Sequence, residues 1–333
     1  IFYTSINIPY GSMASAVSPE PKDRADLSTW RTIGATLAGL VIGVGTPIFA
    51  YETVNGNTVL SGPRMTIIAG GFSVLAIVCY LLCFQLVRER VEVPANNKKL
   101  DISQLFKSLV TNRPLLGIIA AAIALLLATL TMQGMSGYVF PNYYGNAAAQ
   151  SASSFTGSLA VLLICAPLAA KLSEKYGKKE LSVISCLAAA AVYLVCLIVH
   201  PQNAFVYVAF FTLAYVGFGF FNTVIWAMIT DVIDDAEVKS GVREDGTIYS
   251  VYSFARKLGQ ALSAGMTGAL LSLIGYTNVT AFEPEITERI FKLSCIAPLV
   301  GFGLVALFLI VLYPLDKKRV ERNVAELARR RGE

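Results

Sequence analysis

Two bases in this sequence lie at the edges of long apolar stretches, where a charged side chain could bind a polar ligand. Lys257 lies in YSVYSFARKLGQALSAGMTGALLSLIGY, residues 249–276, and Arg31 lies in LSTWRTIGATLAGL. A charge within an apolar helix needs a counter-charge, hydroxyl groups or water, so such residues are candidates for a functional site. The alternative is that each base flanks a membrane-spanning helix as an ordinary interfacial residue.

The position of Lys257 is compatible with both interpretations. A helix that begins near Thr247 would place Lys257 about 15 Å along its axis, close to the middle of a membrane. Residues 258–277 alone could also cross a membrane, which would leave Lys257 in the flanking connection. Arg31 would lie in the first turn of its helix, and for this residue the interfacial interpretation is favoured.

An amide lies in the apolar run at the start of the sequence, where Asn7 is followed by Ile8 and Pro9. Proline within a helix removes a backbone hydrogen bond and kinks the chain. Asn7 offers a donor and an acceptor close to that kink. It could contact a ligand or bond a neighbouring helix, and the residues alone slightly favour the second role. For Trp226, deeper in another apolar run, packing is favoured over stacking on a ligand.

The acidic cluster DVIDDAE, residues 231–237, is of the kind that holds magnesium-diphosphate in membrane prenyltransferases. Such chemistry needs a second acidic cluster facing the first. The other acidic stretch near a helix end, PEPKDRAD, contains its own bases. The sequence has no catalytic Ser-His or zinc motif, and its one histidine, His200, lies at the end of an apolar run. We therefore predict that the protein is not an enzyme and has no metal centre and no cofactor.

The elements that carry these residues are long apolar segments. Hydrophobic residues make up 55% of the 333 residues and charged residues 15%, with a mean hydropathy of +0.61. A helix needs about 20 apolar residues to cross a bilayer, and helices satisfy their own backbone polar groups in lipid. We therefore predict an all-α, polytopic membrane bundle with spans at 32–51, 65–87, 114–138, 151–170, 181–200, 204–230, 250–275 and 291–313, and a partial span at 1–16.

The net charge of +5 is distributed unevenly. All but three of the 27 Lys and Arg residues lie in alternate connections, at 17–31, 88–113, 171–180, 231–257 and 314–333. Because basic connections face the cytoplasm, this bias predicts a cytoplasmic C-terminus. We expect the basic tail to be solvated rather than bound to anionic lipid.

Nine spans with a cytoplasmic C-terminus require a start on the outer side. Transporter halves are often built from three-helix repeats, so nine helices suggest a twelve-helix protein that lacks about its first three. The long polar connection divides the spans into three and six. We predict four parts: 1–87, the remainder of an N-terminal half; 88–113, a central cytoplasmic linker with a short surface helix; 114–313, a six-helix half; and 314–333, a cytoplasmic tail.

Three stretches resemble the glycoside–pentoside–hexuronide:cation symporters, a branch of the major facilitator superfamily that includes melibiose permease. NIPYGSM with KDRADLSTWR resembles helix 4 of that family and the loop after it. DVIDDAEVKSGVREDGTIYSVYSFARKLGQAL resembles the helix 10–11 loop and the start of helix 11, and is the most specific match. KLSEKYGKK is similar to the basic helix 8–9 loop of the superfamily. The resemblance covers essentially the whole chain, beginning within helix 4, and implies the major facilitator fold.

The resemblance implies a substrate site made of Asn7, Arg31, Ser253 and Lys257, with Thr4 beside the cation site. In parallel six-helix repeats, helices 5 and 11 occupy equivalent positions, which fits one isolated base at the start of each. Asn7 stands where melibiose permease has an aspartate. An amide cannot balance a cation or take up a proton, which weakens the expectation of sodium coupling. Two bases with one fewer acid would suit an anionic hexuronide.

Four charged residues of the helix 10–11 connection are expected to form pairs that close the cytoplasmic side: Asp231, Asp234, Arg243 and Glu244.

The resemblance implies a monomeric secondary active transporter of the bacterial inner membrane, with no nucleic-acid partner. It would import a glycoside, pentoside or hexuronide with H+ or Na+ by alternating access. The alternative is a membrane sensor or regulatory protein on the same scaffold that does not transport.

Overall fold

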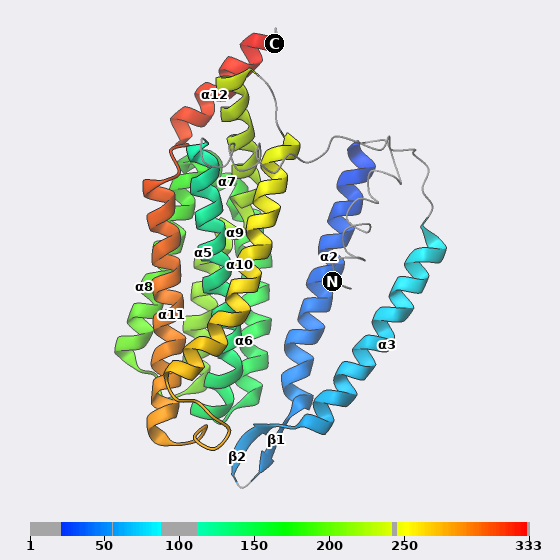
Figure 1. Ribbon diagram of the computed structural model, residues 1–333, viewed down its shortest axis with the longest axis vertical. Helices are drawn as coiled ribbons and strands as arrows, with labels where there is room; N and C mark the ends of the chain where they lie inside the picture. The colour runs from blue at the N-terminus through cyan, green and yellow to red at the C-terminus, as the bar shows by residue number, and fades with distance from the viewer. Residues whose placement is uncertain (1–20, 55, 88–111, 242–244, 332–333) are drawn as a thin grey trace. The chain divides into compact units, whose positions relative to one another are not determined.

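The computed structural model describes residues 21–54, 56–87, 112–241 and 245–331. They are almost entirely helical, and Figure 1 shows the helices as long rods. The helices fall into two units, with α2 and α3 in the first and α5 to α12 in the second. Each unit is described by itself below.

The first unit contains two long helices and part of a short hairpin. α2 (Pro21–Ala50) leads into the paired strands β1 (Tyr51–Val54) and β2 (Asn57–Leu60), and α3 (Gly62–Leu86) follows. Arg64 at the start of α3 donates to the carbonyl of Tyr51 at 2.9 Å and lies 3.5 Å from the carboxylate of Glu52. Arg64 at the start of α3 therefore bonds the residues that directly follow α2, across the connection that the sequence predicted between these two helices.

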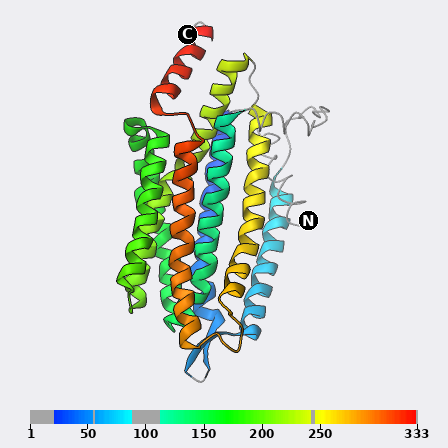
Figure 2. The same cartoon turned by 60° about the vertical axis from the view of Figure 1, so that its left-hand side comes forward.

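The second unit is a bundle whose elements are α5 (Arg113–Tyr138), the π-helical turn η1 (Val139–Tyr143), α6 (Ala147–Ala160), the π-helical turn η2 (Val161–Cys165), α7 (Ala166–Tyr176), α8 (Lys178–Val199), α9 (Ala204–Ser240), α10 (Asp245–Leu273), α11 (Pro284–Val311) and α12 (Lys317–Arg331). The turn η1 continues α5, and η2 joins α6 to α7. α5 packs against α10 and α11, while α8 packs against α9 and α11 (Figure 2). The short helix α12 lies against α9 and α8.

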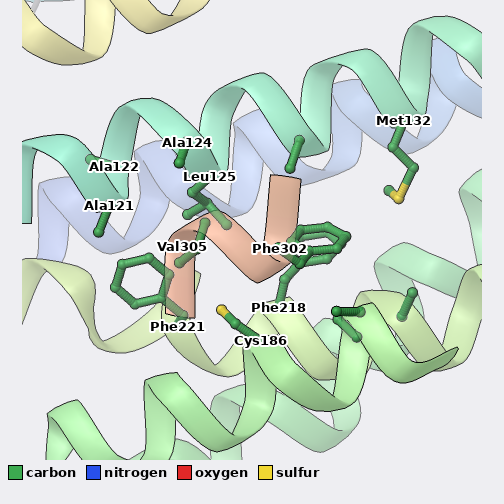
Figure 3. Packing of buried hydrophobic residues seen from close by; sticks show 14 of the residues in the cluster. Ala121, Ala122, Ala124, Leu125, Met132, Cys186, Phe218, Phe221, Phe302 and Val305 are labelled. Carbon is green, nitrogen blue, oxygen red and sulfur yellow. The ribbon is translucent and has the colours of Figure 1, made fainter. Parts of the chain in front are cut away.

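The centre of this bundle is apolar and tightly packed. Phe218 of α9 and Phe302 of α11 stack with ring centres 5.2 Å apart and ring planes 12° apart. Figure 3 shows these rings among Leu125, Cys186 and Val305, which come from α5, α8 and α11. Burial of side chains from four helices in one cluster explains why these residues form one unit.

Small residues allow the helices to approach closely. A Cβ added at Gly301 of α11 would lie 2.6 Å from the Cβ of Ala128 on α5. A Cβ added at Gly217 of α9 would lie 2.7 Å from that of Ala189 on α8. Neither position has room for a methyl group, so glycine is required there for the observed helix separation, as is common in membrane bundles.

Six helical segments of the described residues are long and apolar enough to cross a membrane. They overlap the spans predicted at 65–87, 114–138, 151–170, 181–200, 204–230 and 291–313, of which the first, fourth and last were predicted to end one or two residues later than the helices do. The spans predicted at 32–51 and 250–275 lie largely within α2 and α10, which are not among these six. The partial span at 1–16 lies outside the described residues, so the count of nine stays a prediction.

Among the boundaries that differ from those predicted, two bear on the candidate site. α9 continues to Ser240, ten residues beyond the predicted end of its span, because acidic residues lower hydropathy without breaking a helix. α10 begins at Asp245, before the predicted start at 250. The predicted linker and its surface helix at 88–113 lie outside the described residues up to position 111.

The close approach at Gly301 can be tested with a matched pair on one helix. Gly301→Ala places a methyl group where it collides with Ala128, so we expect overpacking to lower the free energy of unfolding by about 1–3 kcal/mol. Gly303→Ala is the control because a Cβ added there meets no atom within 4 Å. Thermal unfolding in detergent should show a lower Tm only for the first variant. Equal values of Tm for the two would contradict the packing described.

Candidate functional site

The helix that carries Lys257 begins well before it. α10 runs from Asp245 to Leu273, so Lys257 lies about 18 Å along the helix axis. The helix therefore includes Lys257, and both interpretations of its depth in the membrane stay predictions. Ser253, one turn earlier, is half-buried, and the side chain of Lys257 is exposed in the structure. The spacing of four residues places both on one side of α10.

An aromatic platform lies beside this part of α10. Trp226 of α9 stacks on Tyr249, with ring centres 6.0 Å apart, and contacts the edge of Tyr252 at 5.5 Å. The guanidinium of Arg256 lies 5.3 Å from the centre of the Trp226 ring, and it donates to the hydroxyl of Tyr252 at 3.3 Å. Stacking on an aromatic face suits the planar guanidinium and limits its motion.

Trp226 packs against its neighbours and is also partly open. It is 45% exposed, although three neighbours hold its ring. An exposed aromatic ring that is held in place can contact a ligand at little cost in conformational entropy. The preference for packing over stacking on a ligand therefore stays a prediction.

α9 and α10 together therefore present a polar and aromatic surface. It combines the hydroxyl of Ser253, the charges of Arg256 and Lys257, the exposed amide of Gln260 and the ring of Trp226. Such a surface offers hydrogen bonds and an aromatic face to a ligand rich in hydroxyl groups, and its positive charge favours an anionic one.

The side chains of the other three predicted site residues are not among the described ones. Thr4 and Asn7 lie outside the described residues. Arg31 belongs to α2, of which the backbone is described at that position but not the side chain. The roles of all three residues stay predictions.

The acidic cluster is part of α9 rather than of a connecting loop. Asp231 and Asp234 both lie within this helix, which is a correction to the predicted gating loop. Asp231 is only 6% exposed and pairs with Lys178, the first residue of α8, at 2.6 Å. Arg243 and Glu244, their predicted companions, lie outside the described residues. The Asp231 pair therefore joins two helices of one unit.

A second buried carboxylate, Asp235, was not predicted as a site residue. Its Oδ1 accepts from Nε of Arg319 at 3.0 Å and from the amide of Asn323 at 3.1 Å. The ammonium of Lys239 lies 2.6 Å from its Oδ2. Asp235 follows Asp231 by four residues, so the two lie on one face of α9, and this spacing is the signal that the sequence offered.

The basic tail forms the helix α12, which packs one face against the bundle. α12 presents Asn323 and Leu327 to the bundle, both buried. Arg330 donates to the carbonyl of Val238 near the end of α9, and Lys317 donates to that of Lys175 at the end of α7. These contacts fasten three helix ends together.

On its exposed side, α12 carries its own ion pairs. Glu326 accepts hydrogen bonds from both Arg329 and Arg330. These bonds hold the pKa of the Glu326 carboxyl below its usual value. Because the group is open to water, the arrangement adds little to stability.

Comparisons with known proteins agree with this architecture. A family model described as MFS/sugar transport protein matches residues 1–317. The chain is 28% identical to an uncharacterized symporter, YjmB, of Bacillus subtilis, over 98% of this chain and 70% of that protein. It is 28% identical to the glucuronide carrier protein homolog of Escherichia coli, over 99% and 71%. It is 29% identical to a putative sulfoquinovose importer of Salmonella typhimurium, over 99% and 69%.

The buried carboxylate that holds α12 gives a direct test. Asp235→Asn keeps the size of the side chain but removes its charge, so Arg319 and Lys239 lose their partner. We expect the free energy of unfolding to fall by about 1.5–3 kcal/mol, the usual contribution of hydrogen bonds to a charged group. Thermal unfolding measures the loss of stability. The rate of tryptic cleavage within α12, which should rise, measures how far this helix detaches from the bundle.

The control variant for this test is Glu321→Gln. Glu321 lies 3.7 Å from Lys317 in an exposed pair, so its loss should leave both measurements unchanged. If Asp235→Asn behaves like this control, Asp235 does not hold α12 to the bundle.

Proposed function

Because this chain belongs to the MFS/sugar transport protein family, we propose that it carries a small sugar across a membrane by alternating access. Members of this family are multi-pass membrane transporters and not enzymes, and the predicted resemblance to sugar symporters is confirmed at the level of this family. The substrate class, the coupling ion and the direction of transport belong to the proposal.

The proposed substrate class is an anionic glycoside, with a hexuronide as the first candidate. The observation that carries this choice is the surface of α9 and α10, where Arg256 lies 5.3 Å from the exposed ring of Trp226 and Lys257 is the next residue of α10. A guanidinium and an ammonium can bind a carboxylate, while the ring offers an apolar face to a sugar. The names of two relatives, a glucuronide carrier homolog and a putative sulfoquinovose importer, contain sugars with an acid group and support the same class.

Each residue of the proposed site has a role that follows from its chemistry. Lys257 would supply a charge to the acid group of the sugar, and Ser253 a hydroxyl. Asn7 and Arg31 would hydrogen-bond the sugar from the N-terminal half, with Thr4 beside the cation. The substrate would lie between the two halves, as it does in transporters built from repeats.

Coupling to H+ or Na+ would arise from thermodynamic linkage. If the cation and the sugar each raise the affinity for the other, a cation gradient drives accumulation of the sugar. Asn7 cannot take up a proton, so the coupling carboxylate would lie elsewhere. The proposed orientation places the basic connections and α12 in the cytoplasm of a bacterial inner membrane, with the protein acting as a monomer.

In this mechanism the pairs at the basic end of the second unit keep its helices together as the halves rock. Lys178–Asp231 joins α8 to α9, and Asp235–Arg319 joins α9 to α12. Asp234, Arg243 and Glu244 remain proposed members of a gate on this side.

Uptake of labelled sugar by cells that express the full-length gene tests the function. We expect accumulation of a glucuronide above its external concentration, and an ionophore that collapses cation gradients should abolish it. Failure to accumulate any glycoside, pentoside or hexuronide, in cells that insert the protein into the membrane, would favour the sensor.

The role of Lys257 predicts a difference between charged and neutral sugars. Lys257→Gln removes the positive charge, and hydrogen bonds to charged groups contribute about 1.5–3 kcal/mol, which corresponds to about 10- to 150-fold in affinity. Uptake of a glucuronide should therefore fall far more than uptake of the matching neutral glucoside. Lys318→Gln, at an exposed position of α12, is the control and should change neither. An equal loss for both sugars would contradict a charge-recognition role.

A further inference from the structure

The one histidine of this sequence, His200, lies at the opposite end of the second unit from α12. α8 starts with Lys178, which pairs with Asp231 near α12, and it ends at Val199, directly before His200. His200 has a φ of 50°, and no other described non-glycine residue has a positive φ. A strained backbone held in place by its surroundings is a reason to examine what the side chain does.

The imidazole ring of His200 is fixed by its neighbours. It stacks on Phe291 of α11, with ring centres 4.4 Å apart and planes 15° apart. Phe291 also stacks on Tyr143, which belongs to the π-helical turn η1. The backbone N–H of His200 donates to the carbonyl of Cys196 at 3.0 Å. The ring therefore has a defined orientation between η1 and α11.

Two polar partners share one nitrogen of this ring. Nε2 of His200 lies 2.8 Å from the hydroxyl of Tyr143 and 3.2 Å from Oε2 of Glu288 on α11. A neutral imidazole with its proton on Nδ1 has a lone pair at Nε2, which accepts the O–H of Tyr143. A protonated imidazole has an N–H at Nε2, which donates to the carboxylate of Glu288. The two partners thus favour opposite charge states.

We propose that His200 is a proton-binding site whose occupation moves the ring's hydrogen bond from Tyr143 on η1 to Glu288 on α11. The imidazole is the side chain that ordinarily changes charge near neutral pH, and here its two states attach the end of α8 to different elements. Uptake of one proton would thereby alter the contacts at this end of the bundle. The inference goes beyond the proposed sugar transport and does not depend on it.

The charged and polar groups around His200 either favour or oppose protonation of its ring. Glu288 stabilises the protonated ring. Lys292 pairs with the other oxygen of Glu288, Oε1, at 3.1 Å, and its charge opposes protonation. Gln202 lies 3.4 Å from the hydroxyl of Tyr143, to which it donates. Other ionisable groups at this end include Tyr144, which donates to the carbonyl of Pro201, and Tyr207, whose ring contacts that of Phe291. They also include the thiols of Cys196 and Cys295 and the pair of Arg289 and Glu285.

Nuclear magnetic resonance of the full-length protein, labelled with carbon-13 in its histidine rings, tests the proposal. His200→Gln identifies the signal of this residue by its loss. In the unaltered protein we expect the chemical shift of that signal to change as the ring takes up a proton on acidification. A ring signal that keeps one chemical shift as the solution is made acidic would overturn the proposal.

Three variants predict three signed changes in the titration midpoint. Glu288→Gln removes the carboxylate that favours the charged ring and should lower the midpoint. Lys292→Gln removes a repelling charge and should raise it. Tyr143→Phe removes the donor to the neutral ring and should also raise it. Titration is measured directly, so these outcomes do not depend on sugar uptake.

Arg289→Gln is the matched control, because Arg289 follows Glu288 by one residue and pairs with Glu285 instead. We expect it to leave the midpoint unchanged. Thermal unfolding at one fixed pH checks that every variant is folded. The proposal is wrong if Glu288→Gln leaves the midpoint of a folded protein unchanged, or shifts it no more than Arg289→Gln does.

Discussion

Lipid cannot hydrogen-bond, so a polar side chain in a membrane bundle has to find its partner within the protein. Inside the second unit, several polar side chains meet this need through short contacts between neighbouring helices. The hydroxyls of Thr156 and Thr212 lie 2.6 Å apart, and Gln133 donates to Tyr215 at 3.1 Å. Charged pairs lie towards the helix ends, as Lys178 does at the start of α8. The same constraint separates an apolar, close-packed centre from two polar ends.

The two polar ends make different uses of their charges. At the end near α12, the buried acids Asp231 and Asp235 have close basic partners from other helices, which joins α8, α9 and α12 into one body. At the other end, His200 is shared between two partners that favour different charge states. A body that is fixed at one end and adjustable at the other is compatible with a half that rocks as a unit while its outer contacts change.

The sequence predicted the fold well where the signal was the length of an apolar run. It left open whether Lys257 lies within a helix or in the connection before it, and the start of α10 at Asp245 places Ser253 and Lys257 on one helix. It missed the extension of α9, since hydropathy falls at Asp231 while the helix continues. It missed the contact of Trp226 with Arg256, because that contact depends on how α9 and α10 lie side by side.

The tail shows the limit of reasoning from composition. Its many bases favoured a solvated tail and gave no sign of a docked face, whereas Val320, Asn323 and Leu327 place one side of α12 against the bundle. Asp235 and Arg319 are separated by 84 positions along the chain. During synthesis α9 is complete long before α12 leaves the ribosome. Asp235 therefore has no contact with Arg319 while the intervening helices are inserted. The end of the bundle near α12 is therefore assembled late. A chain that stops before α12 would lack the ion pair between Asp235 and Arg319, and this missing pair distinguishes an incomplete bundle from a complete one.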